Sequence, residues 1–234
     1  MRLKKEKLKL GILFSGGKDS NLAMNYAKKY GEIKCLISIL SLNKESYMFH
    51  TPNIKYVIKQ ADAMKLPIII EETKGAKEQE LEDLKRAIKR AKEVYKINGI
   101  VTGAIESVYQ ASRIQKICNE LGIECFNVLW QKNQFEILEE IIKLKFDVVI
   151  TGVFAEGLDD FLGKKIDKNF IEAIKIVEGK YKINVAGEGG EFESFVLDAP
   201  LFKKRIEILT CHVEKDKSGG KILVLDEISL ENKK

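Results

Sequence analysis

The sequence predicts an α/β protein: a doubly wound, five-stranded parallel sheet followed by a smaller C-terminal α+β domain. Through the first 128 residues, short apolar runs alternate with longer segments of helical spacing, which is typical of β-α-β units and a parallel sheet. After Trp130 the alternation changes, and the chain ends in two apolar segments around a glycine turn. We therefore expect one domain over residues 1–128 and a second over residues 129–234.

The elements expected in the first domain follow in regular order. Strands are predicted over residues 9–14, 33–39, 67–70, 99–102 and 124–128. Helices are predicted over residues 18–30, 53–64, 77–96 and 107–121. Gly31 and Gly122 are expected to cap two of the helices, and Pro52 to start another. Loops at the carboxyl ends of such strands carry the ligand site.

The second domain is expected to mix both kinds of element. Helices are predicted over residues 135–143 and 169–178, and strands over residues 146–153, 205–213 and 221–225. Lys217, Ser218, Gly219 and Gly220 predict a hairpin between the last two strands. The preceding residues 154–163 and 187–194 are read as loops, and a short apolar run then ends at Asp198.

Composition narrows the possible functions. The net charge of +5 is mild and does not indicate a nucleic-acid-binding stripe. No run approaches the ~20 apolar residues of a membrane span, and no signal peptide is recognisable, so a cytoplasmic location is expected. Four cysteines without a C-x-x-C pair argue against a zinc site. Cys118 and Cys125 could be sulfur carriers, but scattered buried thiols are the better interpretation.

The first strand runs directly into Ser-Gly-Gly-Lys-Asp-Ser, at the start of a helix. The glycines allow close approach to an anion, and the helix N-terminus favours its negative charge. The spacing is too short for the common ATPase loop, and an ordinary capped glycine turn is the alternative. Asp19 could hold Mg²⁺, which usually joins phosphate oxygens to one or two carboxylates. The expected nucleotide-binding residues are Ser15, Gly16, Gly17, Lys18, Asp19 and Ser20, and this segment is called here the phosphate loop.

Two further loops end at the same expected edge of the sheet. In the first, Met48 and Phe49 either pack against an adenine ring or anchor the loop to the protein core, and His50 could reach a phosphate. The second begins at Gly103 and leads into a helix on which Tyr109 and Gln110 each share a face with Arg113. Arg113 could grip a phosphate or carboxylate through two bonds, or pair at the surface with Glu106 or Glu120.

Residues 187–193 read Gly-Glu-Gly-Gly-Glu-Phe-Glu and are called here the acidic segment. The glycines imply tight backbone geometry, and the carboxylates imply a metal, an ammonium or a general-base role. An acidic surface turn is the alternative. Asp159 and Asp160, in an earlier loop, could bind a metal, although a structural turn is favoured.

Together these segments resemble the diphthine–ammonia ligase (diphthamide synthase) family, a branch of the PP-loop N-type ATP pyrophosphatases with an adenine nucleotide alpha hydrolase-like fold. The resemblance covers nearly the whole chain. Its sharpest marker is the acidic segment, and Ser194 departs from the Thr expected in many relatives. It implies a short archaeal form, since eukaryotic relatives are expected to carry extra C-terminal domains.

The resemblance implies that ATP adenylates diphthine, a modified histidine of translation elongation factor 2, and that ammonium displaces AMP to give diphthamide. ATP and Mg²⁺ are the implied cofactors. The diphthine form of the factor and ammonium are the implied partners, without nucleic acid or membrane, and a homo-oligomer is left open. Asp19, Arg113, Glu188 and Glu191 are the expected catalytic residues, with Asp19 also the metal ligand. The expected cofactor-binding residues are the six of the loop, His50 and Gly103. The expected substrate-binding residues are Tyr109, Gln110, Trp130, Phe192 and Glu193, in part as an aromatic and acidic pocket for the trimethylammonium group.

Two other functions fit parts of the sequence. A PP-loop enzyme that adenylates a tRNA nucleobase would need a nucleic-acid surface, and usually a reactive cysteine pair or an RNA-binding domain. A nucleotide-binding sensor of related fold would lack the Ser-Gly-Gly-x-Asp-Ser loop. Release of pyrophosphate would separate the sensor from any ligase.

Overall fold

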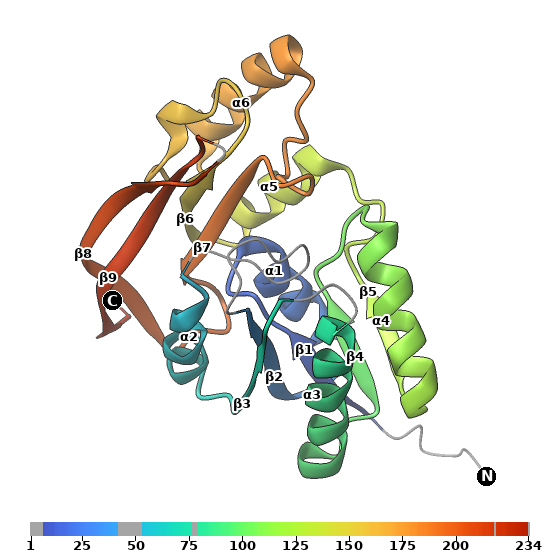
Figure 1. Ribbon diagram of the computed structural model, residues 1–234. Helices are drawn as coiled ribbons and strands as arrows, with labels where there is room; N and C mark the ends of the chain where they lie inside the picture. The colour runs from blue at the N-terminus through green and yellow to red at the C-terminus, as the bar shows by residue number, and fades with distance from the viewer. Residues whose placement is uncertain (1–6, 42–52, 76–78, 218, 234) are drawn as a thin grey trace.

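The computed structural model describes residues 7–41, 53–75, 79–217 and 219–233. Within them the chain forms two sheets, a parallel one and an antiparallel one (Figure 1). No helix among the described residues is long and apolar enough to cross a membrane.

The first sheet is parallel throughout and has the strand order β3-β2-β1-β4-β5. Its strands are β1 (Leu8–Leu13), β2 (Gly31–Ser41), β3 (Ile68–Thr73), β4 (Gly99–Thr102) and β5 (Glu124–Asn127). The chain moves from β1 outward to β3 and then returns to β4 on the other side of β1. The loops after β1 and β4 therefore leave the sheet side by side, at the switch point where such sheets bind ligands.

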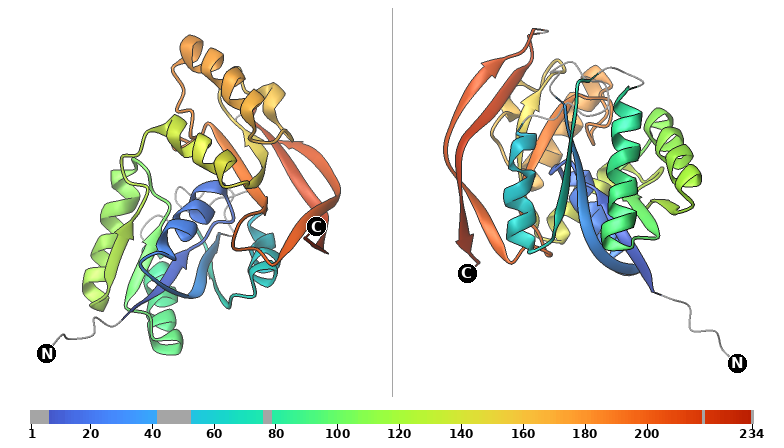
Figure 2. Two further views of the ribbon diagram at one scale, coloured as in Figure 1. Left: turned by 180° about the vertical axis from the view of Figure 1, so that it is seen from behind. Right: turned by 60° about the horizontal axis from the view of Figure 1, so that its bottom comes forward.

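Helices cover both faces of this sheet, so the predicted doubly wound arrangement is confirmed (Figure 2). Helices α1 (Lys18–Ala27) and α2 (Val57–Met64) pack on one face, where Leu22, Ala61 and Ile12 share a core. Helices α3 (Gln79–Tyr95) and α4 (Val108–Leu121) pack on the other face, around Ile88 and Ile100.

The second sheet is antiparallel and has the order β7-β6-β9-β8. Its strands are β6 (Asp147–Val153), β7 (Phe192–Asp198), β8 (Lys204–Lys215) and β9 (Lys221–Asn232), with helices α5 (Gln134–Lys143) and α6 (Lys168–Tyr181) alongside. Ile150 and Phe195 of this sheet belong to the same buried cluster as Leu22 of α1. The two sheets thus share one core, and the boundary at residues 128 and 129 stays a prediction.

Two local predictions in the first domain differ from the structure. Helix α1 ends at Ala27, and Gly31 begins β2 instead of capping the helix. A Cβ on Gly31 would lie 2.6 Å from the Leu8 carbonyl oxygen, so glycine is needed for close packing on β1. The predicted helix over residues 53–64 is divided into a 3₁₀ turn, η1 (Ile54–Tyr56), and α2. Pro52 lies outside the described residues.

The largest difference is β7, for which the sequence pattern predicts only the end of a loop and a short apolar run. Ser194 is buried in this strand and Glu193 is half-buried, so the polar residues hide its alternation. The predicted β8–β9 hairpin is present, but β9 continues to Asn232. Asp159 lies in a second 3₁₀ turn, η2 (Asp159–Phe161), and its carboxylate pairs with Lys221 at 2.7 Å, which agrees with a structural role.

Candidate active site

The loop between β1 and α1 turns sharply at Gly16, whose φ of 81° lies in the left-handed region that favours glycine. A Cβ at this position would also lie 2.3 Å from Gln60 Oε1. Gly17 is the N-cap residue of α1 and makes no side-chain cap bond. The sequence therefore places a glycine where the chain must bend and approach its neighbours closely.

Two elements from elsewhere in the chain hold this loop. Gln60 of α2 donates from Nε2 to the carbonyls of Gly16 and Val196, at 2.9 and 2.8 Å. The Val196 amide of β7 also donates to the Gly16 carbonyl, at 3.1 Å. Ser194 Oγ accepts from the Lys18 amide at 3.2 Å. Strand β7 thus builds the phosphate loop together with β1 and α1, a contribution that the sequence pattern did not reveal.

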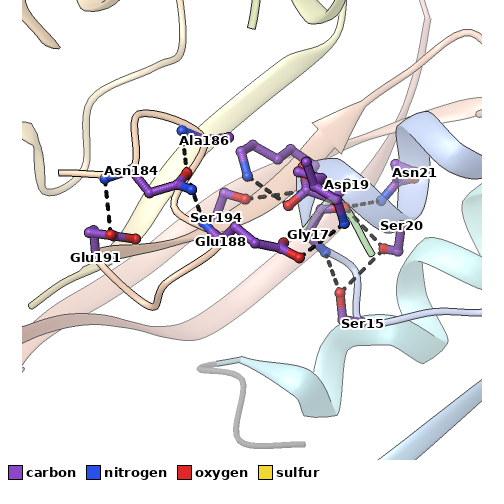
Figure 3. A network of polar contacts seen from close by, with 12 residues as sticks. Ser15, Gly17, Asp19, Ser20, Asn21, Asn184, Ala186, Glu188, Glu191 and Ser194 are labelled. Carbon is purple, nitrogen blue, oxygen red and sulfur yellow. Dashed lines mark hydrogen bonds and ion pairs between the residues drawn. The ribbon is translucent and has the colours of Figure 1, made fainter. Parts of the chain in front are cut away.

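Inside the loop, hydroxyl and amide groups fix the turn (Figure 3). Ser15 and Ser20 are joined through their Oγ atoms at 3.3 Å, and Ser20 Oγ donates to the Gly17 carbonyl at 3.1 Å. Asn21 donates to the same carbonyl at 3.0 Å. Ser15 remains exposed, so its hydroxyl faces the space where a ligand would bind.

Lys18 is 2% exposed, and its ammonium is directed inward. Nζ lies 2.7 Å from Asp19 Oδ2 and 5.2 Å from the centre of the Phe192 ring. The second oxygen, Asp19 Oδ1, is buried and has no hydrogen-bond partner among the described residues. Burial raises the pKa of Asp19, the Lys18 ammonium opposes this shift, and the charge of Glu188 adds to it.

A cavity of about 400 Å³ opens beside the loop, and its size is typical of small-molecule sites. Both parts of the chain line it. Of the expected site residues, the lining includes Ser15, Gly17, Lys18, Asp19, Ser20, Gly103, Gln110, Glu188, Phe192 and Glu193.

Gly103, at the end of β4, packs closely against the first turn of α1 beside this cavity. A Cβ on Gly103 would lie 2.9 Å from the Ser20 amide nitrogen and the same distance from the Asp19 carbonyl carbon. These are backbone atoms of the first turn of α1, which cannot give way as a flexible side chain can. Glycine at this position therefore lets the end of β4 contact the phosphate loop.

The acidic segment folds back over the start of α4. Glu188 Oε1 accepts hydrogen bonds from the backbone amides of Ile105, Glu106 and Ser107, at 2.9, 3.0 and 3.1 Å. A carboxylate at this position also suits the positive end of the helix dipole. Glu188 thus ties the segment to the loop that follows β4.

Glu191 is directed into its own segment. Its two oxygens accept from the amides of Asn184 and Gly189, at 3.0 and 2.9 Å, and it does not line the cavity. Asn184 in turn accepts from the amides of Ala186 and Glu188, at 3.0 and 3.3 Å (Figure 3). Asn184 organises the segment but was not a candidate, because nothing in its local sequence marks it.

Glu193 lies on β7 at the edge of the cavity, and its carboxylate makes no hydrogen bond or ion pair among the described residues. Burial raises its pKa to about 7; the Lys18 ammonium acts in the opposite direction, and the Asp19 carboxylate raises the pKa further. Phe192 forms a wall of the cavity and packs edge-on against Phe170.

The structure does not bring every candidate to the cavity. On α4 the lining residues are Gln110 and Ile114, whereas Tyr109 and Arg113 lie outside the lining. The guanidinium carbon of Arg113 lies 3.5 Å from the centre of the Tyr109 ring. Trp130 also lies outside the lining. Met48, Phe49 and His50 fall outside the described residues.

The surface pairing considered for Arg113 is not seen among the described residues. Glu120 pairs with Lys85 at 2.6 Å, and Glu106 accepts from Gln134 at 3.3 Å. Arg113 Nε is buried without a hydrogen-bond partner in the described part of the chain.

The cysteines are all free, but they are not uniformly buried as expected. Cys35 and Cys118 are buried, Cys125 is half-buried, and Cys211 is exposed, in the part of β8 from Leu209 to Lys215 where every residue is exposed. None lines the cavity.

Comparisons with known proteins agree with this geometry. The family model "Diphthamide synthase N-terminal domain" matches residues 8–125, and "Diphthamide synthase C-terminal domain" matches residues 133–227. A diphthine–ammonia ligase of Bos taurus is 34% identical over an alignment of 220 residues that covers 85% of this chain and 82% of that protein.

The chain belongs to the diphthine–ammonia ligase family. It is therefore an enzyme, a ligase, and the family points to ATP use and to diphthamide amidation as its general activity. A ligase of the same name from Schizosaccharomyces pombe is 30% identical over 88% of this chain but only 37% of its own length. The expectation of longer eukaryotic relatives thus holds for that protein and not for the one from Bos taurus.

Similarity to solved structures is at a low level. A predicted subunit of tRNA methyltransferase from Methanocaldococcus jannaschii has a TM-score of 0.43 and 16% identity, over 82% of this chain and 98% of that one.

Proposed function

We propose that this protein uses ATP to amidate the carboxylate of diphthine on translation elongation factor 2, with ammonium as the nitrogen donor. The products are diphthamide, AMP and pyrophosphate. The observation that carries the proposal is the shared wall of one cavity. Residues of the phosphate loop and of the acidic segment line it together, and Ser194, which directly follows the acidic segment, accepts a hydrogen bond from the amide of Lys18, 176 residues earlier in the chain.

The phosphate loop is proposed to hold the β- and γ-phosphates, so that the carboxylate of diphthine attacks the α-phosphorus. The N-terminus of α1 and the hydroxyls of Ser15 and Ser20 would stabilise the charge that develops on pyrophosphate. Because they lack a side chain, Gly16, Gly17 and Gly103 would let the backbone approach the phosphates closely. Lys18 would contribute its positive charge from within the protein, since its ammonium is buried against Asp19 and Phe192.

Asp19 fits a magnesium ion, because its buried Oδ1 has no hydrogen-bond partner among the described residues. Within the same residues no group of three or more His, Cys, Asp or Glu side chains could hold a metal. This suits Mg²⁺, which is usually bound by one or two carboxylates together with phosphates. When bound, the ion would neutralise phosphate charge.

The remaining candidates are proposed for the acceptor. Gln110 and Phe192 line the cavity where diphthine would enter, and Phe192 offers a ring to its trimethylammonium group. Trp130, Tyr109 and His50 stay proposals for substrate and nucleotide contacts. Arg113 remains a proposed ligand of the α-phosphate or substrate carboxylate, supported by its unpartnered Nε. Glu188 and Glu191 are proposed to support catalysis by holding the backbone around the cavity through hydrogen bonds to its amides. A cytoplasmic location and a homo-oligomer also stay proposals.

The proposal is tested by incubating the protein with ATP, Mg²⁺, ammonium and the diphthine form of elongation factor 2. Mass spectrometry of the factor should show OH replaced by NH₂, together with equal amounts of AMP and pyrophosphate. If the factor stays unchanged and AMP forms only when tRNA is supplied, the acceptor is RNA and the proposal is wrong.

A further inference from the structure

The three glutamates of the acidic segment are alike in sequence, but their surroundings differ. Glu188 Oε1 accepts three backbone hydrogen bonds, and Glu191 uses both of its oxygens on backbone amides. Charge-assisted bonds of this kind are stronger than neutral ones and hold a carboxylate in place. These two groups are therefore committed to backbone structure.

Glu193 differs from both. It lines the cavity, and its side-chain carboxylate makes no hydrogen bond or ion pair within the described residues. It stands opposite Gly152 of β6, at a shift in the strand register. A Cβ on Gly152 would lie 3.2 Å from Glu193 Cβ and 2.8 Å from the Phe154 ring, so glycine leaves room for both side chains. Of the three glutamates, Glu193 is thus the one that lines the cavity with a carboxylate not held by backbone amides of the described residues.

The charged groups acting on Glu193 both come from the first turn of α1. They are the Lys18 ammonium and the Asp19 carboxylate, which pair with each other at 2.7 Å. Because Lys18 is already paired, Glu193 keeps capacity for another cation. A carboxyl group with a pKa of about 7 can also take up and release a proton near neutral pH.

We propose that Glu193 is the carboxylate that receives ammonium and takes its proton as the nitrogen attacks. This role rests on the amidation proposed above. Ammonium gives one proton to Glu193, and the freed nitrogen lone pair forms the C–N bond at the acyl carbon of the adenylate. The bond from that carbon to the phosphate oxygen breaks, AMP leaves with the electron pair, and the nitrogen loses its second proton to water.

The test separates the two half-reactions in Glu193→Gln, which keeps the size of the side chain. ATP–pyrophosphate exchange, measured with the diphthine-bearing factor, reports adenylation and should stay within a few-fold of the parent protein. Amide formation from ammonium should fall by roughly 10² or more, which is typical for loss of a proton acceptor. Hydroxylamine is uncharged at neutral pH and needs no such acceptor, so it should restore acyl transfer and give the hydroxamate.

Glu188→Gln and Glu191→Gln are the matched comparisons, because whatever they lose should not return with hydroxylamine. Glu207→Gln, exposed on β8 and outside the cavity lining, controls for a lost surface charge. Unimpaired amidation in Glu193→Gln overturns the proposal, as does loss of exchange or a defect that hydroxylamine does not relieve. If the parent protein itself forms no amide, the proposed function fails, and that result is distinct from all of these.

Discussion

The backbone amide of Lys18 donates to the hydroxyl of Ser194 across 3.2 Å, which joins the first turn of α1 to β7. The bond is buried and connects the phosphate loop to the strand that carries Glu193. Together with the bonds that Val196 and Gln60 make to Gly16, this hydroxyl sets the distance between the proposed nucleotide and nitrogen sites.

Replacing Ser194 by Ala should loosen that connection. The Lys18 amide would lose its partner, with a cost of about 1 kcal/mol in the free energy of unfolding. We expect the KM for ATP to rise more than kcat falls, as measured by steady-state pyrophosphate release. Ser194→Thr keeps the hydroxyl and should behave like the parent; equal defects in both variants would contradict this account.

Gln60 is fully buried and bridges the carbonyls of Gly16 and Val196. Gln60→Met keeps the length of the side chain but removes both donated bonds, so unfolding should become easier by about 2 kcal/mol in urea titrations. Gln115→Met, on the exposed face of α4, should change this free energy by less than about 0.5 kcal/mol. A Gln60 variant as stable as that control would show that the bridge does not hold the loop.

A methyl group at Gly103 should displace the first turn of α1, because Cβ would meet backbone atoms at 2.9 Å. We expect Gly103→Ala to lower kcat/KM for ATP roughly ten-fold or more, since small displacements in a site have large effects. Gly179→Ala in α6 is the control, because nothing lies within 4 Å of its added Cβ. Matching kinetics in the two variants would count against contact between β4 and the loop.

The raised pKa of Glu193 predicts a pH-dependent stability. In the folded state Glu193 keeps its proton up to a pKa of about 7, above the ordinary 4.5. The stability that this protonated carboxyl group contributes is therefore present at low pH and is lost as the pH rises through 7. The melting temperature of Glu193→Gln should therefore exceed that of the parent protein at pH 8 and differ little from it at pH 4. Melting curves at the two pH values check the sign, and Glu207→Gln should show no such difference.

The phosphate loop was predictable because strand, turn and helix are adjacent in the sequence. The parallel sheet was predictable for the same reason, since each unit has its own apolar spacing. Strand β7 was not, because Ser194 and Glu193 are polar for the sake of contacts with α1 and the cavity. Their partners lie far away in the chain, where local spacing carries no signal.

The sequence also could not predict which face of α4 is turned toward the cavity. Spacing shows that Tyr109 and Arg113 are neighbours, but the rotation of the helix is set by Ile117 and Cys118, which pack on the sheet. That packing turns Gln110 to the cavity and leaves Arg113 against the Tyr109 ring. Asn184 escaped notice because its partners are backbone amides.

The most direct test of the central claim supplies isotopically labelled ammonium together with ATP, Mg²⁺ and the diphthine form of elongation factor 2. The account predicts that peptide mass spectrometry will find the labelled nitrogen in the amide of the modified histidine, with one AMP formed for each amide. An unlabelled or unmodified histidine, while ATP is converted to AMP on another acceptor, would contradict it.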